Sequence, residues 1–219
     1  MNFKNLIGGG LAGVALMVCS AAQAIVIDDF NVTTTSAVSD ATLNATASTT
    51  PSIIDGANIV MDGAAGWSRT LSASLTAGAD FVETIVCGGC QVGHFNAQNP
   101  ATGIGEFIYA GTGVAFDGTA IAFDYNLDLA GSVVDILLSN GDVLSSGPLA
   151  ASLPGWTTVT INFGAGDYSN ITGLTVRVTG TQAADFSIDN LRTVPVPMPL
   201  ALMALGLLGL GLLRRKATV

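Results

Sequence analysis

The chain has 219 residues, of which 49% are apolar and only 11% charged, and its formal net charge is −9. A chain so apolar and so poor in charge does not fit the class of disordered proteins, and its length suits one domain or two small ones. The acidity excludes a nucleic-acid binder, which needs a cationic surface to contact phosphates. These totals combine three unlike segments, which we take in chain order.

The first 24 residues have the pattern of a secretory signal peptide. Lys4 precedes an apolar run from Leu6 to Val18, and Ala22-Gln23-Ala24 has small residues at the two positions that signal peptidase reads. The run is too short to span a bilayer stably. We therefore predict that residues 1–24 pass through the inner membrane and are removed by signal peptidase. A short N-terminal anchor is the alternative.

Residues 25–193 form the predicted ectodomain, which is strongly acidic. All sixteen acidic residues of the chain lie here, beside three arginines and no lysine, so the net charge is −13. Such a surface repels anionic polymers and nucleic acid and favours divalent cations or neutral ligands. Solubility outside the cell is the simpler explanation of the same charge. The arginines are Arg69, Arg177 and Arg192.

Alternation of apolar and polar residues predicts many short β-strands and no helix in this region. Turn signals such as Asn140-Gly141-Asp142 and Pro154-Gly155 separate them. The stretch 32–52, almost wholly Thr, Ser and Ala, is compatible with a strand pair or a loop. Even spacing of short strands predicts a single all-β, antiparallel sandwich. The predicted strands are 25–32, 57–61, 67–75, 81–86, 105–110, 120–127, 132–138, 156–163, 174–179 and 186–192.

Two cysteines remain after removal of the signal peptide, in Cys87-Gly88-Gly89-Cys90. An isolated pair in an exported protein predicts a disulfide, and the two glycines allow the short loop to close. A redox-active pair would usually open a helix, whereas the flanks here are strand-like. A third interpretation adds His94, the only histidine, as part of an incomplete zinc site.

Enzyme chemistry has little support in the sequence. The chain contains no G-x-S-x-G motif for a nucleophilic serine. Glu83 and Glu106 are the only glutamates, and they could hydrolyse a glycoside only if they faced one another about 5–9 Å apart. We therefore expect a domain that is not an enzyme.

The later half of the ectodomain resembles the jelly rolls of carbohydrate-binding modules. The resemblance rests on the Trp-led strand 156–163 and on the closing segment Phe186-Ser187-Ile188-Asp189-Asn190-Leu191-Arg192. It implies a jelly-roll-like sandwich whose first and last strands run side by side.

Acidic residues at the two ends of the ectodomain predict a structural calcium site. Asp28 and Asp29 lie in the first predicted strand and Asp189 in the last, and Ca²⁺ takes six to eight oxygen ligands. The jelly-roll resemblance supports this position, since such modules commonly hold a structural calcium there. An aspartate at a strand end that only caps a turn is the alternative.

Sugar binding would need an aromatic platform with amides and carboxylates beside it. The predicted platforms are Trp67, Tyr109 and Tyr125, with Tyr168 as a further candidate. We expect Trp156, which begins an alternating strand, to lie in the core. Each aromatic residue can equally be a packing residue.

The last segment, residues 194–219, reads as a membrane-directed tail. Val194-Pro195 and Pro197 precede an uncharged apolar helix predicted over 199–213, and Arg214, Arg215 and Lys216 follow it. Prolines prevent a helix from running in from the domain. The positive cluster fixes that end of a short transmembrane helix in the cytoplasm and the domain outside.

This tail resembles the PEP-CTERM sorting signals of exported proteins in Gram-negative bacteria that make extracellular polysaccharide. The shared features are the prolines, the Leu/Gly/Ala-rich helix and the basic cluster, with Val196 where the family has Glu, so it is a variant VPxP signal. The resemblance implies processing by an exosortase and transfer from the membrane to the cell surface or matrix. We therefore expect a non-catalytic, structural or adhesive protein of an extracellular polysaccharide layer or biofilm. A carbohydrate-binding module is the alternative, and a secreted glycoside hydrolase is a more distant one.

Overall fold

A computed structural model describes residues 24, 26–30, 35–40, 46–53, 67–78, 80–116 and 118–195, with the backbone alone over 46–53. The described ranges contain strands and turns and no helix, so none that could cross a membrane. Residues 24–194 form one compact unit. The predicted signal peptide apart from Ala24, the predicted span at 199–213 and the predicted strand at 57–61 lie outside the described residues.

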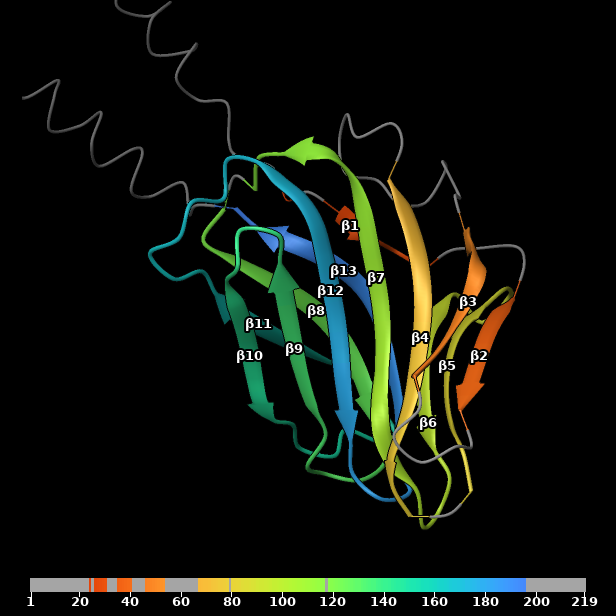
Figure 1. The fold of residues 1–219 in the computed structure, drawn as a ribbon. Helices are drawn as coiled ribbons and strands as arrows, with labels where there is room; N and C mark the ends of the chain where they lie inside the picture. The colour runs from red at the N-terminus through yellow and green to blue at the C-terminus, as the bar shows by residue number, and fades with distance from the viewer. Residues whose placement is uncertain are drawn as a thin grey trace, which may run out of the picture. The chain divides into compact units, whose positions relative to one another are not determined.

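One of the two sheets has six strands, all antiparallel, in the order β10-β9-β12-β7-β4-β3 (Figure 1). Its long central strands carry alternating buried and outward side chains, as a sheet covered on one face requires. The strands are β3 (Thr46–Ile53), β4 (Ser68–Ala77), β7 (Thr102–Val114), β9 (Val133–Leu138), β10 (Val143–Pro148) and β12 (Ile171–Gly180).

The other sheet has seven strands in the order β11-β8-β13-β6-β5-β2, and β1 pairs with β13 beside this path. The last strand of the domain, β13, therefore lies in the middle of its sheet. The strands are β1 (Val26–Asp28), β2 (Ser36–Asp40), β5 (Val82–Cys87), β6 (Val92–Ala97), β8 (Ala120–Leu127), β11 (Thr157–Asn162) and β13 (Asp185–Val194).

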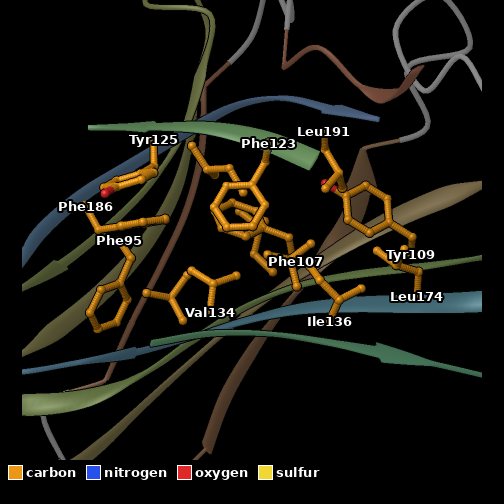
Figure 2. Packing of buried hydrophobic residues seen from close by; sticks show 14 of the residues in the cluster. Phe95, Phe107, Tyr109, Phe123, Tyr125, Val134, Ile136, Leu174, Phe186 and Leu191 are labelled. Carbon is orange, nitrogen blue, oxygen red and sulfur yellow. The ribbon is translucent and has the colours of Figure 1, made fainter. Parts of the chain in front are cut away.

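The core lies between the two sheets and is rich in aromatic side chains that meet from both (Figure 2). Phe30 packs edge-on against Phe107 with ring centroids 5.5 Å apart. Tyr125 and Phe186 stack on neighbouring strands with centroids 6.3 Å apart. The predicted antiparallel sandwich is confirmed.

Phe95 of β6 fills a space that only glycines leave open in the opposite sheet. Its ring is fully buried, and it lies over Gly105 of β7 and Gly180 of β12. A Cβ atom at either glycine would overlap the ring. The two sheets therefore approach closely at this point because two positions have no side chain.

A buried polar cluster ties β1 to the six-stranded sheet. Asp28 accepts hydrogen bonds from the guanidinium of Arg69, from the Tyr109 hydroxyl at 2.7 Å and from the Phe30 amide at 2.7 Å. Arg69 is 1% exposed, and its Cζ lies 5.3 Å from the centre of the Phe30 ring. Burial raises the pKa of Asp28 above its ordinary value, against the lowering effect of the Arg69 charge and these hydrogen bonds.

The predicted strands with clear alternation are confirmed, with small shifts of their ends. The strand predicted at 120–127 is β8 with the same limits, and those at 81–86, 132–138 and 156–163 match β5, β9 and β11 within one residue at each end. The stretch 32–52 supplies β2 and most of β3, which lie in different sheets. Strands β6 and β10 were not predicted.

Candidate functional site

The outer face of the six-stranded sheet carries a row of polar side chains in register across four strands. Ser72 of β4 lies opposite Glu106 of β7, Glu106 opposite Arg177 of β12, and Arg177 opposite Asp135 of β9. Residues directly opposite one another in an antiparallel sheet point to the same face. The flanking residues of these strands are buried in the core, so this row lies on the outer side of the sheet, although Ser72 itself is only 3% exposed.

The row borders a hollow of about 260 Å³ on this face. Its lining consists of Ser72, Ser74, Ile104, Glu106 and Arg177. Serine hydroxyls, a carboxylate and a guanidinium thus surround one aliphatic side chain. A concave site with a few convergent polar groups and an apolar surface is the usual form of a small-molecule binding site.

An ion pair organises the hollow. Arg177 Nε donates to Glu106 Oε1 at 2.8 Å, and the side chains are 38% and 16% exposed. This hydrogen bond uses Nε, and a guanidinium carries further N–H donors on its two terminal nitrogens. Donors and acceptors fixed this close together can bind neighbouring hydroxyl groups of one ligand.

The three ectodomain arginines have different roles. Arg69 is buried in the core, and Arg192 binds Asp124 on the outer face of the seven-stranded sheet at 3.3 Å. Arg177 alone among these three borders the hollow. In a domain with a net charge of −13, this arginine offers a ligand a rare cationic donor.

Asp124 is the centre of a separate hydrogen-bond network on the seven-stranded sheet. It accepts from Thr158 Oγ1 at 2.5 Å, from Asn190 Nδ2 at 2.9 Å and from Arg192. Burial is the largest single influence and raises its pKa, but these hydrogen bonds and the Arg192 charge together lower the pKa below the ordinary value. Both carboxylate oxygens are engaged by the protein, so the network is a structural one.

We expect Asp124→Asn to lower the free energy of unfolding at pH 7 by about 1 kcal/mol. A carboxylate with a lowered folded-state pKa stabilises the protein above its unfolded-state value of about 3.9 and stops doing so as the pH falls through the lowered value. Urea unfolding of both proteins between pH 7 and pH 3 measures the difference. The difference should shrink below about pH 4; a constant difference would contradict the assignment.

The aromatic residues predicted as sugar platforms are buried, which corrects that prediction. Trp67, Tyr109 and Tyr125 are 3%, 1% and 4% exposed. Trp67 Nε1 donates to the Thr112 carbonyl at 2.9 Å, and Tyr109 belongs to the Asp28 cluster. A ring enclosed by the core cannot stack on a sugar. Tyr168 is partly buried against Phe163, with ring centroids 4.4 Å apart.

Trp156 was predicted to lie in the core and is instead 49% exposed. It immediately precedes β11, whose Ile161 points into the core. Side chains alternate along a strand, so residues of odd number point inward and Trp156 falls on the outer side with Thr158.

The residues of the predicted calcium site have different surroundings. Asp28 points into the core toward Arg69 and Tyr109. Burial raises the pKa of Asp189 above its ordinary value, and the charges of Asp124, Asp29 and Asp28 add to this. Within the described residues no group of three or more His, Cys, Asp or Glu side chains is arranged to hold a metal ion. Calcium binding stays a prediction.

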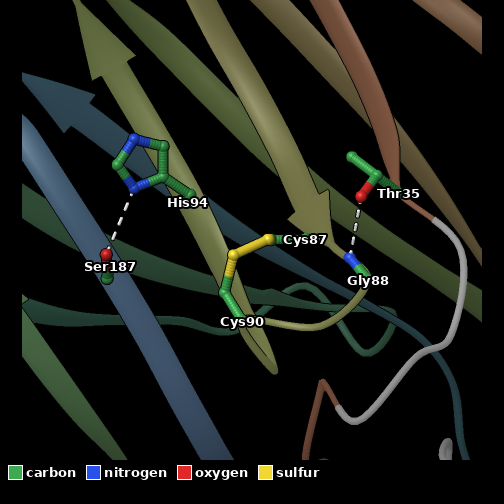
Figure 3. The surroundings of a disulfide bond; sticks show 6 residues. All are labelled: Thr35, Cys87, Gly88, Cys90, His94 and Ser187. Carbon is green, nitrogen blue, oxygen red and sulfur yellow. Dashed lines mark hydrogen bonds between the residues drawn. A yellow bond between two sulfur atoms is a disulfide. The ribbon is translucent and has the colours of Figure 1, made fainter.

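Cys87 and Cys90 are joined by a disulfide that closes the turn between β5 and β6 (Figure 3). The Gly88 amide in this turn donates to the Thr35 hydroxyl at 3.0 Å. His94 points to the outer face of the seven-stranded sheet, where its Nδ1 lies 3.1 Å from Ser187 Oγ. Oxidised cysteines provide no thiolate, so this state is incompatible with the zinc interpretation.

Glu83 and Glu106 do not form a catalytic pair. The neighbours of each glutamate in its strand are buried, so Glu83 points outward from the seven-stranded sheet and Glu106 outward from the six-stranded one. The two carboxylates therefore lie on opposite outer faces, whereas glycoside hydrolysis needs them across a single bond.

The sorting residues lie at or beyond the end of the domain. Val194 is the last residue of β13, and its carbonyl accepts a hydrogen bond from the Thr119 amide at 2.8 Å. Pro195 follows directly and ends the pairing, since proline has no amide proton. Pro197, Arg214, Arg215 and Lys216 lie outside the described residues.

No protein-family model matches the chain, and no curated protein matches it. Solved structures similar to it include carbohydrate-binding modules. A family 11 module from Clostridium thermocellum, in complex with a β-1,3-1,4-mixed-linked tetrasaccharide, is 15% identical with a TM-score of 0.42, covering 81% of this chain and 98% of that one. A variant of a family 29 module is 16% identical with a TM-score of 0.37, covering 78% and 91%.

Proposed function

We propose that this is an exported protein whose β-sandwich binds a neutral extracellular polysaccharide without cleaving it. The observation that carries the proposal is the hollow on the six-stranded sheet, where Ser72, Glu106 and Arg177 converge in register. Sugar hydroxyls both donate and accept hydrogen bonds. The serines, the carboxylate and the guanidinium supply both kinds of partner, and Ile104 offers an apolar contact for the C–H face of a sugar ring.

The negative charge of the domain favours a neutral polysaccharide as the ligand over an anionic one. With sixteen acidic and three basic residues over 25–194, the domain repels anionic polysaccharides at long range. One of its few cations is already paired with Glu106 in the hollow. A neutral glycan is not repelled by the negative charge of the domain. It also does not compete with Glu106 for Arg177, as an anionic ligand would.

Affinity electrophoresis of residues 25–194 in gels containing neutral and anionic polysaccharides tests the proposal. Retardation by a neutral polysaccharide is expected. Unchanged mobility with every neutral polysaccharide tried would overturn the function and leave a structural role in the matrix.

A matched pair of arginine variants locates the binding site. We expect Arg177→Met to weaken binding at least about tenfold, whereas Arg192→Met should bind as the unchanged domain does. Both substitutions remove a partly exposed arginine that is ion-paired on an outer sheet face, but only Arg177 borders the hollow. Isothermal titration calorimetry with the polysaccharide that retards the domain in the gel measures the dissociation constants. Equal affinity of the two variants would place the binding site elsewhere.

We further propose that the tail is read by an exosortase-type enzyme, which delivers the domain to the cell surface or matrix. The support is the sequence pattern of Val194, Pro195 and Pro197 followed by the basic cluster. Replacement of both prolines together with deletion of 214–216 should leave the protein unprocessed in the membrane fraction. Unchanged release to the surface would contradict this.

The predicted calcium site has its own test. Calorimetric titration of residues 25–194 with Ca²⁺, together with thermal melting, would reveal heat of binding and a raised melting temperature if Asp28, Asp29 and Asp189 hold the ion. No heat and no shift would end the hypothesis.

A further inference from the structure

Strand β11 forms one edge of the seven-stranded sheet, and this edge is regular. Among the described strands it pairs only with β8, through six consecutive residue pairs from Thr157↔Tyr125 to Asn162↔Ala120 without a bulge. Its sequence, Trp156 to Phe163, contains no charged residue, no proline and no glycine. An uncharged, regular edge is a template for pairing with another strand.

The alternation of hydrogen bonds between β11 and β8 shows which backbone amides and carbonyls of β11 point away from the sheet. The Phe163 amide donates to the Thr119 carbonyl of the neighbouring chain segment at 2.9 Å. Bonded pairs alternate along an antiparallel ladder, so Val159 and Ile161 also direct their amides and carbonyls toward β8. The backbone groups of Thr158, Thr160 and Asn162 therefore point outward along the edge.

Two other edges of the sandwich, β10 and β3, are protected in ways that β11 is not, whereas the edge strand β2 is regular like β11 but shorter and carries Asp40. The neighbouring edge of the six-stranded sheet, β10, has an irregular register between Ser145 and Pro148 and a glycine with positive φ at Gly147. At the far end of that sheet, β3 has an irregular register between Thr49 and Ile53, with Pro51 inside it. Proline and bulges are common devices that block edge pairing.

Exposed apolar side chains adjoin the start of β11. Leu129, Leu153 and Trp156 are 47%, 58% and 49% exposed, and they are three of the four large hydrophobic residues exposed in the described ranges. The Leu153 amide donates to the Leu127 carbonyl at 3.4 Å, which holds this loop against the end of β8. Exposed apolar residues beside an open edge are typical of an interaction surface.

We propose that a second copy of this chain pairs with β11 and extends the seven-stranded sheet across a two-fold axis. The register that uses every outward group sets Thr160 against Thr160 of the second copy and Thr158 against Asn162, with about six hydrogen bonds. Continued beyond the strands, this register brings Trp156 opposite Gly164 of the second copy. Two domains of net charge −13 repel one another over most of their surfaces, and β11 offers an uncharged contact.

Charge variants at Thr160 test both the contact and its symmetry. Sedimentation equilibrium of residues 25–194, which include the compact unit except for its first residue, should show a dimer. Thr160→Lys and Thr160→Glu should each be monomeric because like charges meet on the axis. An equimolar mixture of the two variants should dimerise again. Restored pairing in the mixture also demonstrates that both variants are folded.

Matched controls separate the edge from a general charge effect. Thr179→Lys introduces the same change at an exposed position of β12, an inner strand of the other sheet, and should remain dimeric. Thr160→Pro removes an outward amide that makes no hydrogen bond to β8, although it also fixes φ and replaces the side chain, and should be monomeric. A monomeric unchanged domain at millimolar concentration, or a mixture of the Lys and Glu variants that stays monomeric, would overturn the proposal. Glycan binding does not enter this measurement.

Discussion

Replacement of Asp28 by alanine is expected to lower the free energy of unfolding at pH 7 by about 3–5 kcal/mol, because it leaves a buried guanidinium without its counter-charge. Arg69 is 1% exposed, and its Nε and Nη2 have no hydrogen-bond partner among the described residues. The same change removes the acceptor of the Tyr109 hydroxyl and of the Phe30 amide. Three buried donors would lose their partner at once.

Urea unfolding followed by tryptophan fluorescence measures this effect, and a double variant provides the control. Asp28→Ala combined with Arg69→Met removes both charges, and we expect it to regain most of the lost stability, because a buried ion pair can be replaced by apolar groups at little cost. A single variant that loses less than about 1 kcal/mol, or a double variant less stable than the single, would contradict the role of this pair.

Phe95→Ala is expected to lower the free energy of unfolding by about 3–5 kcal/mol, the usual range for removing a fully buried ring. The hole left behind would be bordered by Gly105 and Gly180, which have no side chain that could move into it. The cost should therefore lie toward the upper end of this range.

Gly105→Ala tests the same packing from the other sheet. Alone it should destabilise the domain by about 1–3 kcal/mol, because its Cβ overlaps the Phe95 ring and also approaches the Thr84 hydroxyl. In the Phe95→Ala background the new methyl group enters the hole, so the second substitution should cost less than it does alone. Chemical unfolding of the four proteins gives the coupling free energy, and strictly additive losses would contradict the packing described.

The alternation of the sequence predicts much of this fold, and its failures have identifiable causes. Strand β8 is found at its predicted limits because it alternates through eight residues between clear turns. Strand β10 was missed since its Ser-Ser-Gly-Pro ending is typical of a turn. Trp156 was wrongly predicted to lie in the core. Val159 and Ile161 point inward, so in an alternating strand the even-numbered residues, including Trp156, point outward.

The hollow could not be predicted because it depends on register between distant segments. Ser72, Glu106 and Arg177 are separated by 34 and 71 positions in the sequence and meet only because β4, β7 and β12 are neighbours. Glu106 was considered only as part of a catalytic pair, and Ser72, Ser74, Ile104 and Arg177 were not considered for binding. The weak available signal was Arg177, one of three arginines in an acidic domain, placed at an outward position of an alternating strand.

The central place of β13 has a consequence for the order in which the domain can form. This strand lies between β8 on one side and β6 and β1 on the other, and it is the last of the described strands in the chain. Until it arrives, the strands of the seven-stranded sheet form two separate groups, β11-β8 and β6-β5-β2, and β1, which carries Asp28, has no strand to pair with. The seven-stranded sheet, and with it the core between the two sheets, can therefore close only after β13 is available, and we expect the domain to fold slowly because its pairings join segments far apart in the sequence.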